Sequence, residues 1–140
     1  MASKTYLEHL AKVPLFTTCN RKELQKIARA ADEVEIDAGR ALVEQGAAGH
    51  EAFVIIEGQA VVRRNDQDVA TLGPGQAFGE LAILDGGPRT ASVIATEPLR
   101  VLVLGQREFG ALLDEVPGLG RKLLTTMARR VRALDEQIYD

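Results

Sequence analysis

The segment 78–93 places a glycine, an acid and an arginine at a spacing that suits the binding of a phosphate group. Gly79 lacks a Cβ, so the backbone can approach a ligand closely, and we expect a short helical turn directly after it. Free N–H groups at the start of a helical turn bind anions, and the guanidinium of Arg89 can hold phosphate oxygens in a bidentate manner. Glu80 would repel that anion unless it accepted a hydrogen bond from another part of the same ligand, such as a ribose 2′-hydroxyl. The segment therefore predicts a phosphate-binding cassette.

The order of residues in this segment resembles the cassette of the cyclic nucleotide-binding domain family, which includes the catabolite activator protein, regulatory subunits of cAMP-dependent kinase and cyclic-nucleotide-gated channels. The family pattern reads roughly F-G-E-x-A-L-L-x-x-x-P-R-x-A-x-V. The chain matches it at Phe78, Gly79, Glu80, Ala82, Leu84, Pro88, Arg89, Ala91 and Val93, with Ile83 in place of the first leucine of the pair. The likeness extends to residues 13–16, 45–46, 56–58 and 72–75, so it covers nearly the whole chain.

The resemblance implies a role for each cassette residue. Arg89 and the N–H groups near Gly79, Leu81 and Ala82 would hold the cyclic phosphate, and Glu80 would accept from the ribose 2′-hydroxyl. Thr90 can reach the phosphate, and in cGMP-binding relatives it also meets the guanine amino group, so it permits either nucleotide. We expect cAMP rather than cGMP, because nothing else in the sequence requires guanine. The remaining candidate ligand contacts are Ala91, Val62, Leu72 and Phe78, of which the last three would equally suit the core of the fold.

Two interpretations in which the protein binds no ligand stay open. Arg89 and Glu80 could pair with each other in an empty site. Alternatively, the same fold could serve as a ligand-independent interaction or dimerisation module. Titration with cAMP and cGMP separates either reading from a nucleotide sensor.

Length and composition indicate one globular domain over residues 1–140. The chain is 46% hydrophobic and 26% charged, and its net charge of −3 gives no general attraction to nucleic acid or anionic membranes. Its single cysteine cannot form an internal disulfide, and the N-terminus lacks the apolar stretch of a secretory signal. No apolar run approaches the roughly 20 residues needed to span a bilayer. We therefore expect a cytoplasmic protein without a membrane span.

The periodicity of apolar residues predicts a mainly β fold with flanking helices. Residues 1–32 carry a helical period, with a capping box at Asn20 and Glu23. Over residues 33–104 many short runs alternate or are punctuated by glycine, beginning with Val34 and Ile36, which predicts an antiparallel β-roll of the jelly-roll type. The helical period returns over residues 106–138, with a short helix that stops near Pro117 and a long final helix.

The final helix carries two predictions that rest on the resemblance. Arg130 and Leu134 lie where relatives place lid residues over the base, one helical turn apart. Met127, Val131, Leu134 and Ile138 form a heptad-like seam, along which bacterial members of the family dimerise, so we expect a homodimer. The chain ends at Asp140, without the helix-turn-helix module of those regulators. We therefore expect no DNA binding, and an effector protein of unknown identity.

Catalysis is not expected, and neither is a cofactor or a metal. A metal oxygenase on a similar barrel would need clustered histidines and carboxylates. The chain has only His9, in a predicted helix, and His50, in a predicted loop, and we expect both to be exposed. No Ser–His–Asp or Cys–His arrangement is evident either.

Overall fold

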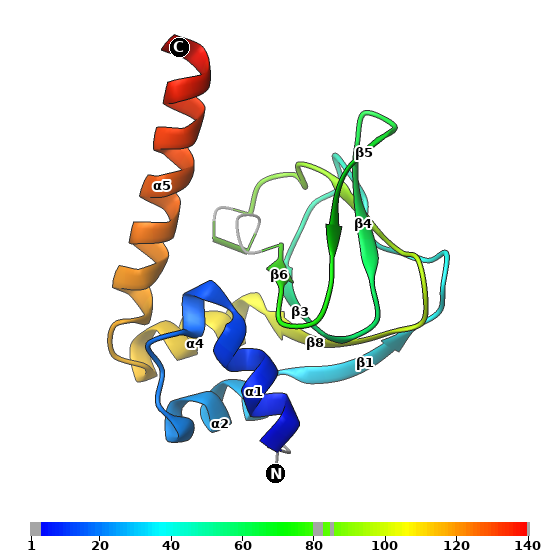
Figure 1. Ribbon diagram of the computed structural model, residues 1–140. Coiled ribbons are helices and arrows are strands. Elements are labelled where there is room, and N and C mark those ends of the chain that lie inside the picture. The colour runs from blue at the N-terminus through cyan, green and yellow to red at the C-terminus, as the bar shows by residue number, and fades with distance from the viewer. Residues whose placement is uncertain (1–3, 80–82, 85, 140) are drawn as a thin grey trace.

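Strands make up the centre of the molecule, as the computed structural model of residues 4–79, 83–84 and 86–139 shows (Figure 1). The described strands are β1 (Asp32–Ile36), β2 (Ala41–Val43), β3 (Glu51–Glu57), β4 (Ala60–Arg64), β5 (Gln67–Leu72), β6 (Ala77–Phe78), β7 (Ser92–Ala95) and β8 (Leu99–Gly105). They form two antiparallel sheets, with the orders β1-β8-β3-β6 and β2-β7-β4-β5. This arrangement confirms the predicted β-roll.

Helices gather on one side of the roll (Figure 1). They are α1 (Lys4–Lys12), the 3₁₀ turn η1 (Pro14–Phe16), α2 (Arg21–Ala30), α4 (Gln106–Glu115) and α5 (Leu119–Tyr139). The predicted capping box begins α2, because the Asn20 side chain accepts from the Glu23 N–H at 2.8 Å and the Glu23 carboxylate accepts from the Asn20 N–H at 2.9 Å. None of the helices in the described part of the chain combines the length and apolar character that crossing a bilayer requires.

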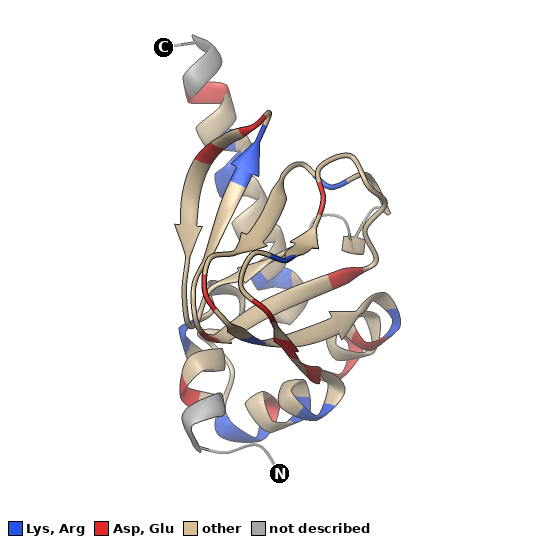
Figure 2. Cartoon of the chain, turned by 90° about the vertical axis from the view of Figure 1, so that its right-hand side faces the viewer, with Lys and Arg blue, Asp and Glu red and all other residues tan. Residues whose placement is uncertain are grey.

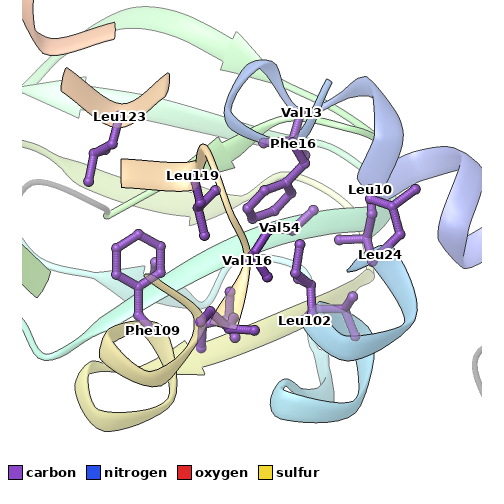
Figure 3. Close-up of a cluster of buried hydrophobic side chains, with 14 of the residues drawn as sticks. Leu10, Val13, Phe16, Leu24, Val54, Leu102, Phe109, Val116, Leu119 and Leu123 are labelled. Carbon is purple, nitrogen blue, oxygen red and sulfur yellow. The ribbon is translucent and has the colours of Figure 1, made fainter. Parts of the chain in front are cut away.

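The central strand β3 is buried on both faces, and its alternation divides the core in two. Ala52, Val54 and Ile56 face the helices, while Phe53 and Ile55 face the interior of the roll. Figure 3 shows side chains from β3, β8 and the helices converging on the helical side. A two-residue period sends neighbours to opposite faces, so one strand supplies both clusters. The same strand therefore fixes the helices relative to the roll.

Strand β1 forms as predicted at one edge of its sheet, and Val34 is 37% exposed. Strand β6 was not predicted, because it has only two residues and is defined by long-range pairing of Phe78 with Phe53 and Ala77 with Val54.

Candidate functional site

A pocket of about 200 Å³ opens at the side of the roll where the cassette meets strands β4 and β5. Its described lining is mostly apolar with three arginines, and no acidic residue is among those described. The lining comprises Val43, Val62, Arg64, Leu72, Ala77, Phe78, Gly79, Pro88, Arg89, Thr90, Ala91, Val93 and Arg130. A pocket of this composition suits a ligand that has an apolar, flat part and a negatively charged part.

Arg89 is the buried cation of this pocket, with only 8% of its surface exposed. Its Nη1 donates to the carbonyl oxygen of Gly79 at 3.3 Å, and its Cζ lies 5.9 Å from the centre of the Phe53 ring. Burial lowers the pKa of the guanidinium, and the Glu51 carboxylate nearby raises it. An arginine is nevertheless charged at physiological pH. A buried charge is costly unless it is paired, so the site is suited to an anion.

Gly79 adopts a backbone conformation that other residues rarely take, with φ of +88°. A Cβ at this position would lie 2.6 Å from Nη1 of Arg89 and 2.8 Å from the carbonyl oxygen of Glu51. The carbonyl oxygen of Gly79 also accepts a hydrogen bond from the N–H of Ile83 at 3.4 Å. The absence of a side chain at Gly79 therefore allows the guanidinium to lie against the main chain at the start of the cassette turn.

The loop between β2 and β3 holds the backbone of Arg89 in place. The N–H of Gly46 donates to the carbonyl of Arg89 at 2.9 Å, and the N–H of Arg89 donates to the carbonyl of Ala47 at 2.8 Å. One residue further, Ala48 and Pro88 form an isolated antiparallel bridge. Arg89 is thus positioned by main-chain bonds from a segment about forty residues earlier in the chain.

The apolar wall of the pocket belongs to the inner core of the roll. Phe78 is 8% exposed and its ring stacks on that of Phe53, with centroids 4.9 Å apart and planes inclined by 13°. Val62 and Leu72 are half-buried beside this cluster. Phe78 therefore serves the core as well as the pocket lining, while Val62 and Leu72 offer apolar surface that a planar base could cover.

Helix α5 reaches the pocket through Arg130, which lines it. Leu134, one turn further along α5, is 60% exposed and is not among the lining residues. In Figure 1 this helix runs along one side of the molecule, with its C-terminal end clear of the roll. Of the two predicted lid residues, the structure therefore brings only Arg130 to the pocket.

Neither histidine is among the described lining residues of this pocket. His50 is exposed as expected, but His9 is half-buried, and its Nδ1 is buried without a hydrogen-bond partner among the described residues. The expectation that His9 is exposed was wrong, because α1 packs its inner face against the rest of the fold. No group of three or more His, Cys, Asp or Glu in the described ranges is placed to hold a metal ion.

The structure brings most of the described candidate residues together at one pocket. Those that line it are Val62, Leu72, Phe78, Gly79, Arg89, Thr90, Ala91 and Arg130. Three further candidates, Glu80, Leu81 and Ala82, lie outside the described residues. Sequence reasoning did not select Val43, Arg64, Ala77, Pro88 or Val93 as lining residues, although Pro88 and Val93 belong to the cassette pattern. Arg64 could have been found by continuing the alternation of β4 two residues beyond Val62.

Comparison with known proteins identifies the family. The model of the cyclic nucleotide-binding domain family matches residues 33–116, so the chain belongs to this family. The chain is 34% identical over 119 residues to a cAMP-dependent protein kinase regulatory subunit of Hypocrea atroviridis, covering 85% of this chain and 26% of the relative.

Two solved structures are similar throughout the fold. The Thermus thermophilus catabolite activator protein matches with a TM-score of 0.83 and 28% identity, over 89% of this chain and 61% of that protein. The regulatory domain of Toxoplasma gondii PKA, crystallised with cAMP, matches with a TM-score of 0.72 and 27% identity, over 80% of this chain and 46% of that one. The chain is thus a cyclic nucleotide-binding domain, and it is similar to part of cAMP-dependent protein kinase regulatory subunits. It spans about a quarter of the length of the first two curated relatives it matches.

Proposed function

We propose that this chain binds a 3′,5′-cyclic nucleotide, cAMP in preference to cGMP, and acts as a sensor without catalytic activity of its own. The observation that carries the proposal is the burial of Arg89 beside the left-handed Gly79. A cyclic phosphate bears one negative charge, which a single buried guanidinium can neutralise. The carbonyl oxygen of Gly79 accepts one hydrogen bond from this guanidinium, which leaves further N–H donors for the oxygens of the phosphate.

The rest of the phosphate and sugar contacts follow from the family pattern. The N–H groups at Gly79, Leu81 and Ala82 hold the phosphate oxygens, and Glu80 accepts from the ribose 2′-hydroxyl. The match of Glu80 and Arg89 to the family motif supports this arrangement, although Glu80, Leu81 and Ala82 lie outside the described residues. Thr90 lines the pocket next to Arg89, which supports its contact with the phosphate. The base then lies over Val62 and Leu72.

The choice of cAMP as the ligand is supported by one similar structure, the Toxoplasma gondii PKA regulatory domain, which was crystallised with cAMP. The lid is the second part of the proposal. Arg130 stacks on the base from α5, and the next turn, with Leu134, closes over it when nucleotide binds. The presence of Arg130 at the pocket supports this role, because a guanidinium plane stacks well on an aromatic base.

We also propose that α5 mediates a homodimer and transmits the nucleotide-bound state of the pocket to an effector protein. Exposed apolar residues along α5 support the dimer, since Leu124, Val131 and Leu134 are 71%, 63% and 60% exposed. They fall at heptad-like spacing. Leu134 cannot serve the lid and the dimer in the same state, so nucleotide binding shifts the monomer–dimer equilibrium. Sedimentation with and without cAMP over a range of protein concentrations measures this shift, and an unchanged mass at every concentration contradicts it.

The binding proposal is tested by equilibrium titration with fluorescent cAMP and cGMP. Saturable binding to the wild-type protein is expected, with cAMP the tighter ligand. Arg89→Ala is expected to weaken cAMP binding by about tenfold to about 150-fold, the range for a lost charge-assisted hydrogen bond. Arg89→Lys keeps the charge and guards against misfolding of the alanine variant, and it is expected to lose affinity because an ammonium lacks the guanidinium fork.

Arg100→Ala is the matched control, because Arg100 lies on β8 with acidic partners outside the pocket. It is expected to leave the affinity unchanged. A folded wild-type protein that binds neither nucleotide contradicts the proposal and favours the ligand-independent module.

A further inference from the structure

Strand β1 lies at the open edge of the sheet that packs against the helices. This sheet has the order β1-β8-β3-β6, so β1 has a neighbouring strand on one side only. It pairs with β8 in an unbroken antiparallel register, from Asp32 opposite Val103 to Ile36 opposite Leu99. Figure 1 shows β1 along the border of the roll. Because alternate residues of an edge strand direct their backbone N–H and C=O groups away from the sheet, β1 presents a row of such groups.

The outer edge of β1 is open to a further strand. Among the described residues, no main-chain hydrogen bond outside the pairing with β8 involves residues 32–36. Four of the five side chains of β1 are exposed, and that of Ile36 is half-buried. Proteins commonly close such an edge with a proline, a lysine or a bulge, and the described strand has none of these. The main chain of β1 can therefore pair with another extended segment.

The side chains at this edge are acidic. Figure 2 shows acidic residues gathered on this part of the roll. The guanidinium nitrogens of Arg100, on β8, lie 3.3 Å from an oxygen of Glu33, 3.6 Å from one of Glu35 and 3.3 Å from one of Glu57. One positive charge thus serves three carboxylates, and the side chain of Glu35 is 80% exposed. A negative charge therefore remains along β1.

The two faces of β1 present different side chains. Glu33 and Glu35 are two residues apart and lie on the face that contacts Arg100, so Val34 and Ile36 lie on the opposite face. A strand paired with β1 would meet carboxylates on one face and apolar side chains on the other. Lysine or arginine alternating with apolar residues complements both faces, because opposite charges on paired strands attract each other.

A second copy of β1 does not complement this edge. Pairing of two β1 strands would place the acidic side chains of one copy among those of the other, and like charges on paired strands are destabilising. A basic strand from a different protein meets no such repulsion. The charges of β1 therefore select a basic partner and disfavour association of this chain with itself through the same edge.

We propose that the open edge of β1 is a docking site for an extended basic segment of a partner protein, which adds to the sheet as a strand beside β1. The main chain of the partner pairs with the outward-directed groups of β1, and its lysine or arginine side chains lie against Glu33 and Glu35. None of the described lining residues of the pocket beside Arg89 belongs to β1. The docking site is therefore separate from the proposed nucleotide site.

The test uses the whole chain and a fluorescent peptide in which lysine and valine alternate over about seven residues, the length of an ordinary strand. Fluorescence anisotropy at an ionic strength of about 0.1 M is expected to show saturable binding. The double variant Glu33→Lys with Glu35→Lys is expected to weaken binding at least about tenfold, because it reverses both charges that the peptide contacts.

Asp114→Lys with Glu115→Lys is the matched control, because it changes the net charge by the same amount at exposed positions on α4. The control is expected to bind the peptide within about threefold of wild type, since charges beyond about 10 Å are largely screened at this ionic strength. Equal weakening in the β1 and α4 variants overturns the proposal, because it indicates a general attraction between charges.

Two N-methylated peptides test the strand pairing on the wild-type protein, so this part does not depend on the folding of a variant. Methyl groups on the lysine nitrogens block one edge of the peptide, and methyl groups on the valine nitrogens block the other, while the charge is unchanged. Strand addition uses one edge of the peptide. One methylated peptide is therefore expected to bind within about threefold of the unmodified peptide, and the other to lose at least about tenfold.

Similar affinities for all three peptides overturn the proposal, and so does a loss of binding by both methylated peptides. Absence of saturable binding by the unmodified peptide overturns it as well. The peptide affinity is measured without nucleotide, and titration of the same sample with cAMP tests the proposed function. Failure of either experiment thus leaves the other conclusion standing.

Discussion

Gln45 and Asn65, twenty residues apart in the sequence, form two hydrogen bonds with each other. The side-chain Nε2 of Gln45 donates to Oδ1 of Asn65, and the backbone N–H of Asn65 donates to Oε1 of Gln45. The backbone N–H of Gln45 also donates to Oγ of Ser92 at 2.8 Å. The next two residues of this loop hold the backbone of Arg89. One short loop therefore connects the β4–β5 hairpin to the buried cation of the pocket.

Gln45→Ala is expected to weaken cAMP binding by about threefold to about tenfold, because it releases the hairpin without removing a pocket residue. The free energy of unfolding is expected to fall by about 1 kcal/mol, since two exposed hydrogen bonds are lost. Gln59→Ala is the control, because it truncates an exposed glutamine whose side chain makes no bond to a pocket element within the described residues. Titration calorimetry and denaturant unfolding measure the two effects, and an affinity loss in Gln59→Ala equal to that in Gln45→Ala contradicts the expectation.

Much of the fold and part of the site could be predicted from local sequence. The capping box of α2 needs only two residues three apart, and β3 is visible as a continuous apolar run. Gly79 and Arg89 were assigned to one site because the family pattern gives both to the phosphate. The capping box and the strand are therefore determined by residues that are close together in the sequence.

The parts of the site that could not be predicted depend on long-range pairing. Val43 reaches the pocket because β2 pairs with β7, opposite Val93, fifty residues further along the chain. The support of Arg89 by Gly46 and Ala47 has no local signal, since it consists of main-chain bonds available to any residue except proline. Arg64 had a local signal in the alternation after Val62, but only the fold reveals that this face of β4 is the wall of a pocket.

The proposed dimer predicts that a charge on the apolar face of α5 dissociates it. Val131→Glu is expected to shift the protein to a monomer at concentrations where wild type dimerises, because a carboxylate at a seam position loses hydration without gaining a partner. Ala133→Glu introduces the same charge at a position that is also exposed but lies on the opposite side of the helix, and it is expected to leave the mass unchanged. Analytical ultracentrifugation distinguishes the two variants. A wild-type protein that sediments as a monomer at every concentration contradicts the proposed dimer.

Cys19 is expected to react slowly with alkylating reagents at pH 8. Burial raises the pKa of its thiol, and the carboxylate of Glu23 raises it further. The thiolate is the reactive form, so a raised pKa leaves less of it at a given pH. The neutral thiol is favoured by the folded state, so its contribution to stability is present below the ordinary thiol pKa of about 8.5 and is lost as the pH rises through the higher folded-state value.

The reaction of Cys19 with iodoacetamide, followed by mass spectrometry, measures this effect. At pH 8 the folded protein is expected to react more slowly than the protein in guanidinium chloride. Glu23→Gln is expected to increase the rate, because it removes the negative charge while glutamine can still complete the capping box. A rate that is unchanged by unfolding argues against a raised pKa.

Gly79→Ala is expected to lower both the stability and the nucleotide affinity. Gly86→Ala distinguishes the effect of backbone strain from the effect of the collision with Arg89. Both glycines have left-handed φ values, +88° and +68°, so alanine at either position costs about 1–2 kcal/mol of backbone strain. A Cβ at Gly86 meets nothing within 4 Å, whereas at Gly79 it collides with Nη1 of Arg89. Gly86→Ala should therefore lower the melting temperature but leave the cAMP affinity within about twofold of wild type. Gly79→Ala should lower the melting temperature further and weaken cAMP binding by at least about tenfold, because the guanidinium must leave its place to make room for the methyl group. Thermal unfolding and cAMP titration of the two variants in parallel test this difference, and equal affinities would show that the contact between Gly79 and Arg89 does not position the cation for its ligand.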